Sequence, residues 1–175
     1  MKLYDLPASP NARRVRIFIA EKDLQIPMVP IDMISGENRK SEYLAKNSLG
    51  RMPLLELDDG NCIAESIAIC RYLESKFPSP PLFGSSGLEQ AIIEMWQRRM
   101  EFLLLNPMIN IFRHTHEMWK DRITQIPQIA EIESEDVKEK MIWLDAELKG
   151  KQYIAGGDYS VADITAQCAF VMGKA

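Results

Sequence analysis

The stretch PLLELDDGNCIAESIAICRYLESKF at residues 53–77 contains the pattern that decides the fold. Its two short apolar runs, 53–57 and 61–64, flank the acidic turn DDG at 58–60. An Asp-Gly pair suits the positive φ angles of a tight hairpin turn, so the runs predict two antiparallel strands. Residues 66–77 then predict a helix. This stretch is therefore expected to form an antiparallel hairpin joined directly to a helix.

Strand and helix patterns also alternate before this hairpin. KLYDL at residues 2–6 predicts a strand, and Ser9 with Pro10 predicts the start of a helix, because serine caps helices and proline favours the first helical position. A second strand at 28–32 is assigned to a sheet edge by its internal proline, and 42–46 is a short helical piece. The order strand, helix, strand, helix, hairpin, helix specifies a small sheet with one parallel pair. That order is thioredoxin-like.

The helix that begins at Pro10 combines an apolar face with several arginines. Val15, Phe18 and Ile19 recur at helical spacing and form the apolar face. The rest of the helix is expected to be its polar side, and it carries Arg13, Arg14 and Arg16.

The second half of the chain has no strand pattern. A linker rich in proline, serine and glycine, PSPPLFGSSG at 78–87, precedes it. Helices are then predicted from residue 88 to about 119 with a kink near Pro107, over 135–149, and from Ser160 onward. We therefore expect an α/β thioredoxin-like domain over 1–80 and an all-helical domain over 88–175.

Composition and charge exclude several classes of protein. Of 175 residues, 46% are apolar and 26% charged, which is typical of a globular chain. The 21 basic residues against 25 acidic ones give a net charge of -4, whereas a nucleic-acid binder needs clustered basic residues. No apolar run is long enough for a membrane span. Three cysteines and two histidines without metal-ligand spacing argue against a metal site, and a cytoplasmic protein is expected.

Four motifs make a family resemblance specific: SPNARRVRI at 9–17, NSLGRMPLLE at 47–56, AESIAICRYL at 64–73 and YIAGGDYSVADI at 153–164. Together they resemble, in order and spacing, the cytosolic glutathione S-transferase family of bacteria and fungi. The resemblance implies the glutathione transferase fold, with glutathione as co-substrate. Members of that family normally continue beyond the last of these motifs, so the chain is expected to be truncated at its C-terminus.

Ser9 is the first candidate for activating the thiol of glutathione. It stands where redox proteins of this fold carry the first cysteine of a CxxC pair, and SPNA contains no cysteine, which excludes dithiol exchange. A hydroxyl at a helix start can instead donate a hydrogen bond to a thiolate. His114, which lies with His116 in a region resembling the wall of the electrophile pocket, is the alternative catalytic residue. Tyr4 is a third candidate, for which core packing is favoured.

Two segments are expected to hold the body of glutathione. The resemblance implies a cis peptide at Met52-Pro53 that turns the backbone of Met52 toward the cysteinyl group of the ligand. Glu65 and Ser66 begin a helix, whose free N–H groups and positive potential favour an anion, and the resemblance assigns the γ-glutamyl carboxylate to them. Arg39, Lys40 and Arg51 are the candidates for the glycyl carboxylate.

The resemblance implies a glutathione S-transferase that adds the activated thiol to a hydrophobic electrophile and forms a homodimer. Two alternatives stay open, a glutathione-dependent isomerase of the maleylacetoacetate type and a noncatalytic binding protein on the same fold. Ser160 and Asp163 form a capping box with a structural role.

Overall fold

The structure is a computed structural model that describes residues 1–173. The chain divides into two compact units, one of residues 1–82 and one from residue 83 onward. Within residues 1–173, no helix combines the length and the apolar character that crossing a membrane requires.

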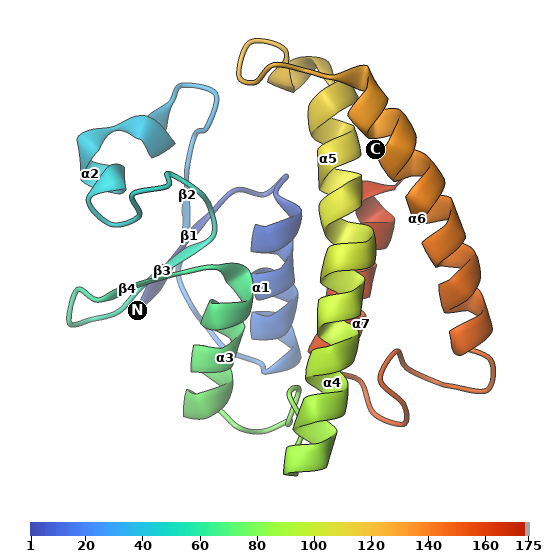
Figure 1. The fold of residues 1–175 in the computed structure, drawn as a ribbon. Coiled ribbons are helices and arrows are strands. Elements are labelled where there is room, and N and C mark those ends of the chain that lie inside the picture. The colour runs from blue at the N-terminus through green and yellow to red at the C-terminus, as the bar shows by residue number, and fades with distance from the viewer. Residues whose placement is uncertain (174–175) are drawn as a thin grey trace. The chain divides into compact units, whose positions relative to one another are not determined.

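The first unit is a four-stranded sheet with helices. Its elements are β1 (Lys2–Asp5), α1 (Pro10–Glu21), β2 (Met28–Pro30), a 3-10 turn (Glu37–Arg39), α2 (Ser41–Leu44), β3 (Leu54–Glu56), β4 (Cys62–Ala64) and α3 (Ser66–Lys76). The strand order is β2-β1-β3-β4, with β1 and β2 parallel and the other pairs antiparallel. Figure 1 shows α1 and α3 side by side, with α2 away from them. The thioredoxin-like topology, the hairpin and the edge position of β2 are confirmed.

The burial of α1 differs from the sequence expectation at one position. Val15, Phe18 and Ile19 are buried as expected, and Arg13 is exposed. Arg14 is completely buried rather than on the polar side, and its Nη1 donates a hydrogen bond to Ser66 Oγ at 2.9 Å. A buried charge is costly unless it is hydrogen-bonded, and this bond satisfies one of the guanidinium's N–H donors. Pattern alone does not reveal a partner 52 residues away.

Lys22, at the end of α1, joins three parts of the first unit. Its side chain is fully buried, and its Nζ lies 2.7 Å from Glu74 Oε2 on α3. The same Nζ donates to the carbonyl oxygens of Phe77 and Pro80, each at 2.7 Å. An ammonium group has three N–H donors, so these three oxygens match its full capacity.

The second unit is helical. It consists of α4 (Gly87–Met100), a π-turn (Glu101–Leu105), α5 (Asn106–Thr115), a 3-10 turn (Glu117–Trp119), α6 (Pro127–Glu147) and α7 (Val161–Met172). In Figure 1, α5 continues from α4 as one long rod, and α6 runs beside α5. The prediction placed the start of α6 too late, since the helix already begins at Pro127, a residue suited to a first helical position.

The irregularity predicted near Pro107 is a π-turn. The N–H of Asn106 bonds to the carbonyl of Glu101, five residues earlier, instead of the fourth. Pro107 follows at once and has no N–H to donate, so an unbroken α-helical ladder is impossible there. The extra residue in the turn accommodates the proline within the rod.

The capping box at the start of α7 is confirmed. Asp163 Oδ2 accepts hydrogen bonds from the backbone N and hydroxyl of Ser160, at 2.9 and 3.0 Å. Its Oδ1 accepts the backbone N–H of Ile154 at 2.8 Å, so the same carboxylate also ties down the preceding loop.

Asp163→Ala is therefore expected to lower the free energy of unfolding by about 0.5 to 2 kcal/mol, the usual cost of a lost cap. Urea denaturation followed by circular dichroism measures it. Asp136→Ala, which removes an exposed i,i+4 pair with Lys140 on α6, is the control and should cost less than about 0.5 kcal/mol. Equal stability of the Asp163 variant and wild type would contradict the structural role.

Candidate functional site

The strand register gathers three loop segments at one end of the sheet. Tyr4 of β1 lies opposite Leu54 of β3, and Leu54 lies opposite Ala64 of β4. Because β3 is antiparallel to both neighbours, the segment after β1, the segment before β3 and the segment after β4 all emerge at this end. These segments carry Ser9, the Met52–Pro53 pair and the Glu65–Ser66 pair respectively. Five of the predicted site residues are thus brought to one end of one sheet.

Ser9 is the N-cap of α1. Its backbone is extended, with φ -76° and ψ 126°, and its Oγ accepts the N–H of Ala12 at 3.3 Å. The loop before it is held by Arg16, which pairs with Asp5 and donates to the carbonyl of Pro7 at 2.8 Å. A serine oxygen that accepts a capping bond still has its own proton to donate. The capping role and the catalytic role predicted for Ser9 are therefore compatible.

Glu65 has a strained backbone at the start of α3. Its φ of 66° and ψ of 119° lie outside the regions that L-residues favour. Such conformations cost about 1 to 3 kcal/mol and persist where the surrounding structure imposes them, often at ligand sites. The next residue, Ser66, is 5% exposed and accepts the hydrogen bond from Arg14 described above. Neither the strain nor the arginine was expected from sequence.

Side chains of α2 and its surroundings hold the loop that leads to Pro53. The Tyr43 hydroxyl and Asn47 Nδ2 both donate to the carbonyl of Arg51, at 2.7 and 2.8 Å. Burial, with the nearby Tyr4 and Cys62, raises the pKa of Tyr43 to about 12, so this phenol stays a neutral donor at physiological pH. The backbone on the N-terminal side of Met52 is thereby fixed.

Gly50 allows the same loop to close tightly. Its φ is 62°, and a Cβ at this position would lie 2.7 Å from the carbonyl oxygen of Asn38, which no side chain permits. Asn38 Nδ2 in turn donates to the carbonyl of Gly50 at 2.7 Å. The Met52–Pro53 peptide is cis, as the family resemblance implies. The binding role of Met52 and Pro53 stays a prediction.

The cations proposed for the glycyl carboxylate lie on the surface around this loop. Arg39, Lys40 and Arg51 are all exposed, and Arg39 Nη1 donates to the carbonyl of Leu49 at 3.4 Å. The nearby Lys46 has a different partner, because its Nζ is 2.6 Å from Glu56 Oε2. The hydrogen bond between them lowers the pKa of Glu56 and raises that of Lys46.

Tyr4 packs in the core, as favoured from sequence. It is buried in a cluster with Ile31, Tyr43 and Leu54, and its ring meets that of Tyr43 edge-on at 5.7 Å. Its hydroxyl donates to Glu56 Oε2 at 2.7 Å.

His114 belongs to the second unit, on α5, and is not among the residues that the sheet register gathers. Its Nδ1 accepts the backbone N–H of Ile126 at 3.2 Å, just before α6 begins. In that geometry the neutral ring carries its proton on Nε2, which can act as a donor. His116 has a similar local bond, with Nδ1 accepting from the N–H of Met118 at 3.2 Å.

The cysteines Cys62, Cys70 and Cys168 are not in disulfides. Among residues 1–173 there is no group of three or more histidine, cysteine or acidic side chains arranged to hold a metal ion.

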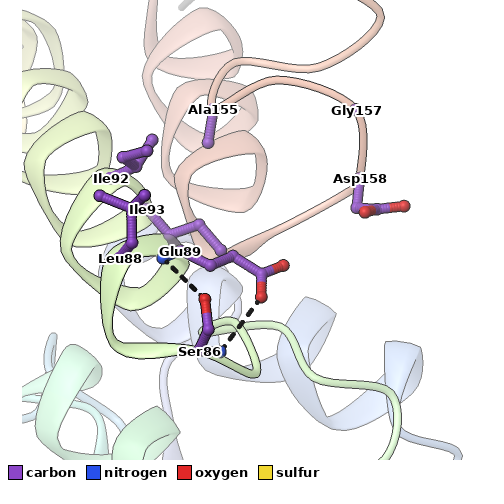
Figure 2. Close-up of a pocket in the computed structure, with 8 residues that line it drawn as sticks. All are labelled: Ser86, Leu88, Glu89, Ile92, Ile93, Ala155, Gly157 and Asp158. Carbon is purple, nitrogen blue, oxygen red and sulfur yellow. Dashed lines mark hydrogen bonds between the residues drawn. The ribbon is translucent and has the colours of Figure 1, made fainter.

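A pocket of about 220 Å³ opens at the start of α4 within the second unit (Figure 2). It is lined by Ser86, Leu88, Glu89, Ile92, Ile93, Ala155, Gly157 and Asp158. The helix start is already capped, since Ser86 Oγ accepts the N–H of Glu89 at 3.2 Å and the Glu89 carboxylate accepts the N–H of Ser86 at 3.4 Å. The pocket contains the carboxylates of Glu89 and Asp158, and the N–H groups of Ser86 and Glu89 already donate hydrogen bonds. It is therefore a poor site for an anion such as glutathione.

Comparisons with known proteins identify the family of this chain. A family model described as glutathione S-transferase, N-terminal domain, matches residues 3–81. Over 174 residues the chain is 37% identical to glutathione S-transferase 2 of Saccharomyces cerevisiae. This alignment covers 94% of this chain and 72% of the yeast protein. The chain belongs to the glutathione S-transferase family.

Two further comparisons bear on the fold of this glutathione S-transferase and on its relatives. A crystal structure of a glutathione S-transferase domain-containing protein from Marinobacter aquaeolei superimposes with a TM-score of 0.93 at 37% identity, over 99% of this chain and 87% of that one. Maleylacetoacetate isomerase of Pseudomonas aeruginosa is 42% identical over 93 residues, which are 52% of this chain and 44% of the isomerase. The glutathione transferase fold expected from the motifs is therefore confirmed.

Arg14 is a buried residue bonded to a predicted site residue, Ser66, and sequence reasoning missed it. It lies four residues before Phe18, so the two share one side of α1, and this position at the border of the apolar face was the available signal. A cation at such a border is usually solvated. Only the position of Ser66 in the fold shows that Arg14 turns inward.

Proposed function

We propose that this chain activates the thiol of glutathione for addition to hydrophobic electrophiles. One observation carries the proposal. The strand register brings Ser9, Ser66 and the Met52–Pro53 loop to one end of the sheet, in a chain of the glutathione S-transferase family.

In this proposal glutathione lies along that end of the sheet. Its γ-glutamyl carboxylate accepts hydrogen bonds from the Ser66 hydroxyl and from free N–H groups at the start of α3. Its cysteinyl backbone pairs with that of Met52, as an added strand does. The glycyl carboxylate is left near the exposed cations Arg39, Lys40 and Arg51.

The chemical step is loss of the thiol proton to solvent and attack of the thiolate sulfur on the electrophile. A new C–S bond forms as the electrophile expels a leaving group with its electron pair, or as a double bond of the electrophile takes up that pair and then a proton. Ser9 donates its hydroxyl proton as a hydrogen bond to the thiolate. A free thiol has a pKa of about 8.5, and lowering it by about 2 needs roughly 2.7 kcal/mol. One preorganised donor to an anion supplies about that much.

His114 is retained as the second candidate activator. A donor at its Nε2, acting directly or through a bound water, would suit a thiolate equally well. The two candidates are separated by substitution, because only removal of the true activator should raise the pKa of the bound thiol.

Ser66→Ala is expected to weaken glutathione binding by about 1.5 to 3 kcal/mol, the range for a hydrogen bond to a charged group. Isothermal titration calorimetry measures the dissociation constant. Ser48→Ala, at an exposed serine, is the control and should bind like wild type. If both variants bind glutathione equally, Ser66 does not contact the ligand.

A glutathione-dependent isomerase is the alternative function, favoured by the 42% identity to maleylacetoacetate isomerase across part of the chain. The two functions differ in their reactions: a transferase consumes glutathione with chloro-dinitrobenzene, whereas an isomerase regenerates it after each turnover. Consumption of one glutathione per product supports the transferase. A folded, glutathione-binding protein with neither activity would be a noncatalytic member of the family.

We also propose a cytoplasmic homodimer, the assembly that the family resemblance implies. Met100 and Met108 of the long helical rod are buried within the single chain, so they do not form an exposed surface. Four of the exposed apolar side chains lie along α4 and the π-turn: Leu88, Ile92, Met95 and Phe102. Such exposed apolar side chains suit a two-fold interface. Sedimentation at monomer mass across a wide concentration range would exclude the dimer.

A further inference from the structure

Arg14 and Ser66 form a buried pair between α1 and α3. Arg14 is 0% exposed and Ser66 5% exposed, and the distance from Nη1 to Oγ is 2.9 Å. A guanidinium has donors only, so the serine oxygen must be the acceptor in this bond. The direction of the hydrogen bond is therefore settled by chemistry alone.

Accepting this bond leaves the Ser66 hydroxyl with its proton and restricts where that proton can point. The proton turns away from the guanidinium, because two positive hydrogens repel each other. No group within residues 1–173 accepts a hydrogen bond from the Ser66 hydroxyl. The strained Glu65 fixes the backbone on the other side, so Ser66 has little freedom to reorient.

We propose that Arg14 is a positioning residue, which holds the Ser66 hydroxyl as a preset donor to the γ-glutamyl carboxylate of glutathione; this inference rests on the proposed function. Arg14 does not touch the ligand. It acts by fixing the Ser66 rotamer before glutathione arrives, so that no entropy of ordering is lost on binding. Its buried charge also polarises the hydroxyl toward donation.

The test is a double-mutant cycle in the dissociation constant of glutathione, measured by calorimetry. Arg14→Met should weaken binding about fivefold to thirtyfold when Ser66 is present, and less than about twofold in the Ser66→Ala background. Arg14→Lys, whose ammonium is shorter and lacks the planar fork, should show the same pattern with a smaller loss. Arg13→Met, at the exposed neighbouring residue, is the matched control and should leave the dissociation constant unchanged.

Calorimetry also distinguishes a loss of binding affinity, which a positioning role predicts, from a loss of folded protein. A variant that merely unfolds lowers the fitted number of sites, whereas the folded molecules keep the wild-type dissociation constant. A positioning residue raises the dissociation constant at an unchanged number of sites. If Arg14→Met does not fold, Arg14→Lys provides the same cycle.

The inference is overturned if a folded Arg14 variant binds glutathione as wild type does, or if the loss is equal with and without Ser66. In both cases the wild-type protein still binds glutathione, so the proposed function stands. A wild-type protein that binds no glutathione overturns the proposed function and this inference together.

Discussion

Ser9→Ala is expected to raise the pKa of the bound glutathione thiol by at least about one pH unit. Each pH unit corresponds to about 1.36 kcal/mol, and a lost donor to an anion costs about 2.7 to 4 kcal/mol in comparable sites. Because the donor favours only the thiolate, affinity for glutathione at low pH should barely change. Thiolate absorbance of the bound ligand against pH measures the effect, and the midpoint should move upward.

The control for Ser9→Ala is Ser86→Ala, which removes a helix cap of the same kind on α4. Both variants lose capping energy of about 0.5 to 2 kcal/mol, and only the first should change the thiol. A Ser9→Ala protein whose bound thiol titrates like wild type would falsify the catalytic assignment. The test would then pass to His114→Ala, which should lower the transferase activity if His114 is the activator.

Lys22→Met is expected to destabilise the protein by about 3 to 5 kcal/mol, the cost of removing one partner from a buried ion pair. The carboxylate of Glu74 would lose its ammonium partner, and the carbonyls of Phe77 and Pro80 would lose their donor. Chemical denaturation followed by tryptophan fluorescence and circular dichroism gives the change in free energy of unfolding.

Two comparisons make the Lys22 result specific. Lys140→Met breaks the exposed pair with Asp136 and should cost at most about 1 kcal/mol. Lys22→Met combined with Glu74→Leu should recover part of the loss, because the carboxylate is then removed as well. A Lys22→Met protein as stable as the Lys140→Met protein would show that the buried contacts contribute little.

Local signals were enough to predict most of the fold. The DDG turn set the hairpin, and Ser160 with Asp163 set the start of α7, because turns and caps depend on residues within a few positions. Pro107 marked the irregular turn in the long rod. The hairpin sets the register of β3 with β4. The pairing of β1 with β3, which brings the segment carrying Ser9 to the same end of the sheet, joins residues about fifty positions apart and is seen only in the structure.

Long-range partners account for what sequence reasoning did not find. Arg14 and Lys22 look like surface cations by type, and each is buried because of partners more than fifty residues away. The start of α6 was missed for a different reason. Its first residue, Pro127, was not recognised as a first helical position, although proline is common there.

The π-turn at Glu101–Leu105 has a consequence for chain length. Each residue of an α-helix advances the rotation by about 100°, so inserting one residue normally turns every later side chain to a new face. A π-turn absorbs one inserted residue and leaves the following turns in phase. Relatives that lack one residue at this point can therefore present the same faces of α4 and α5. A one-residue alignment gap is accordingly expected inside this rod rather than in the loops that flank it.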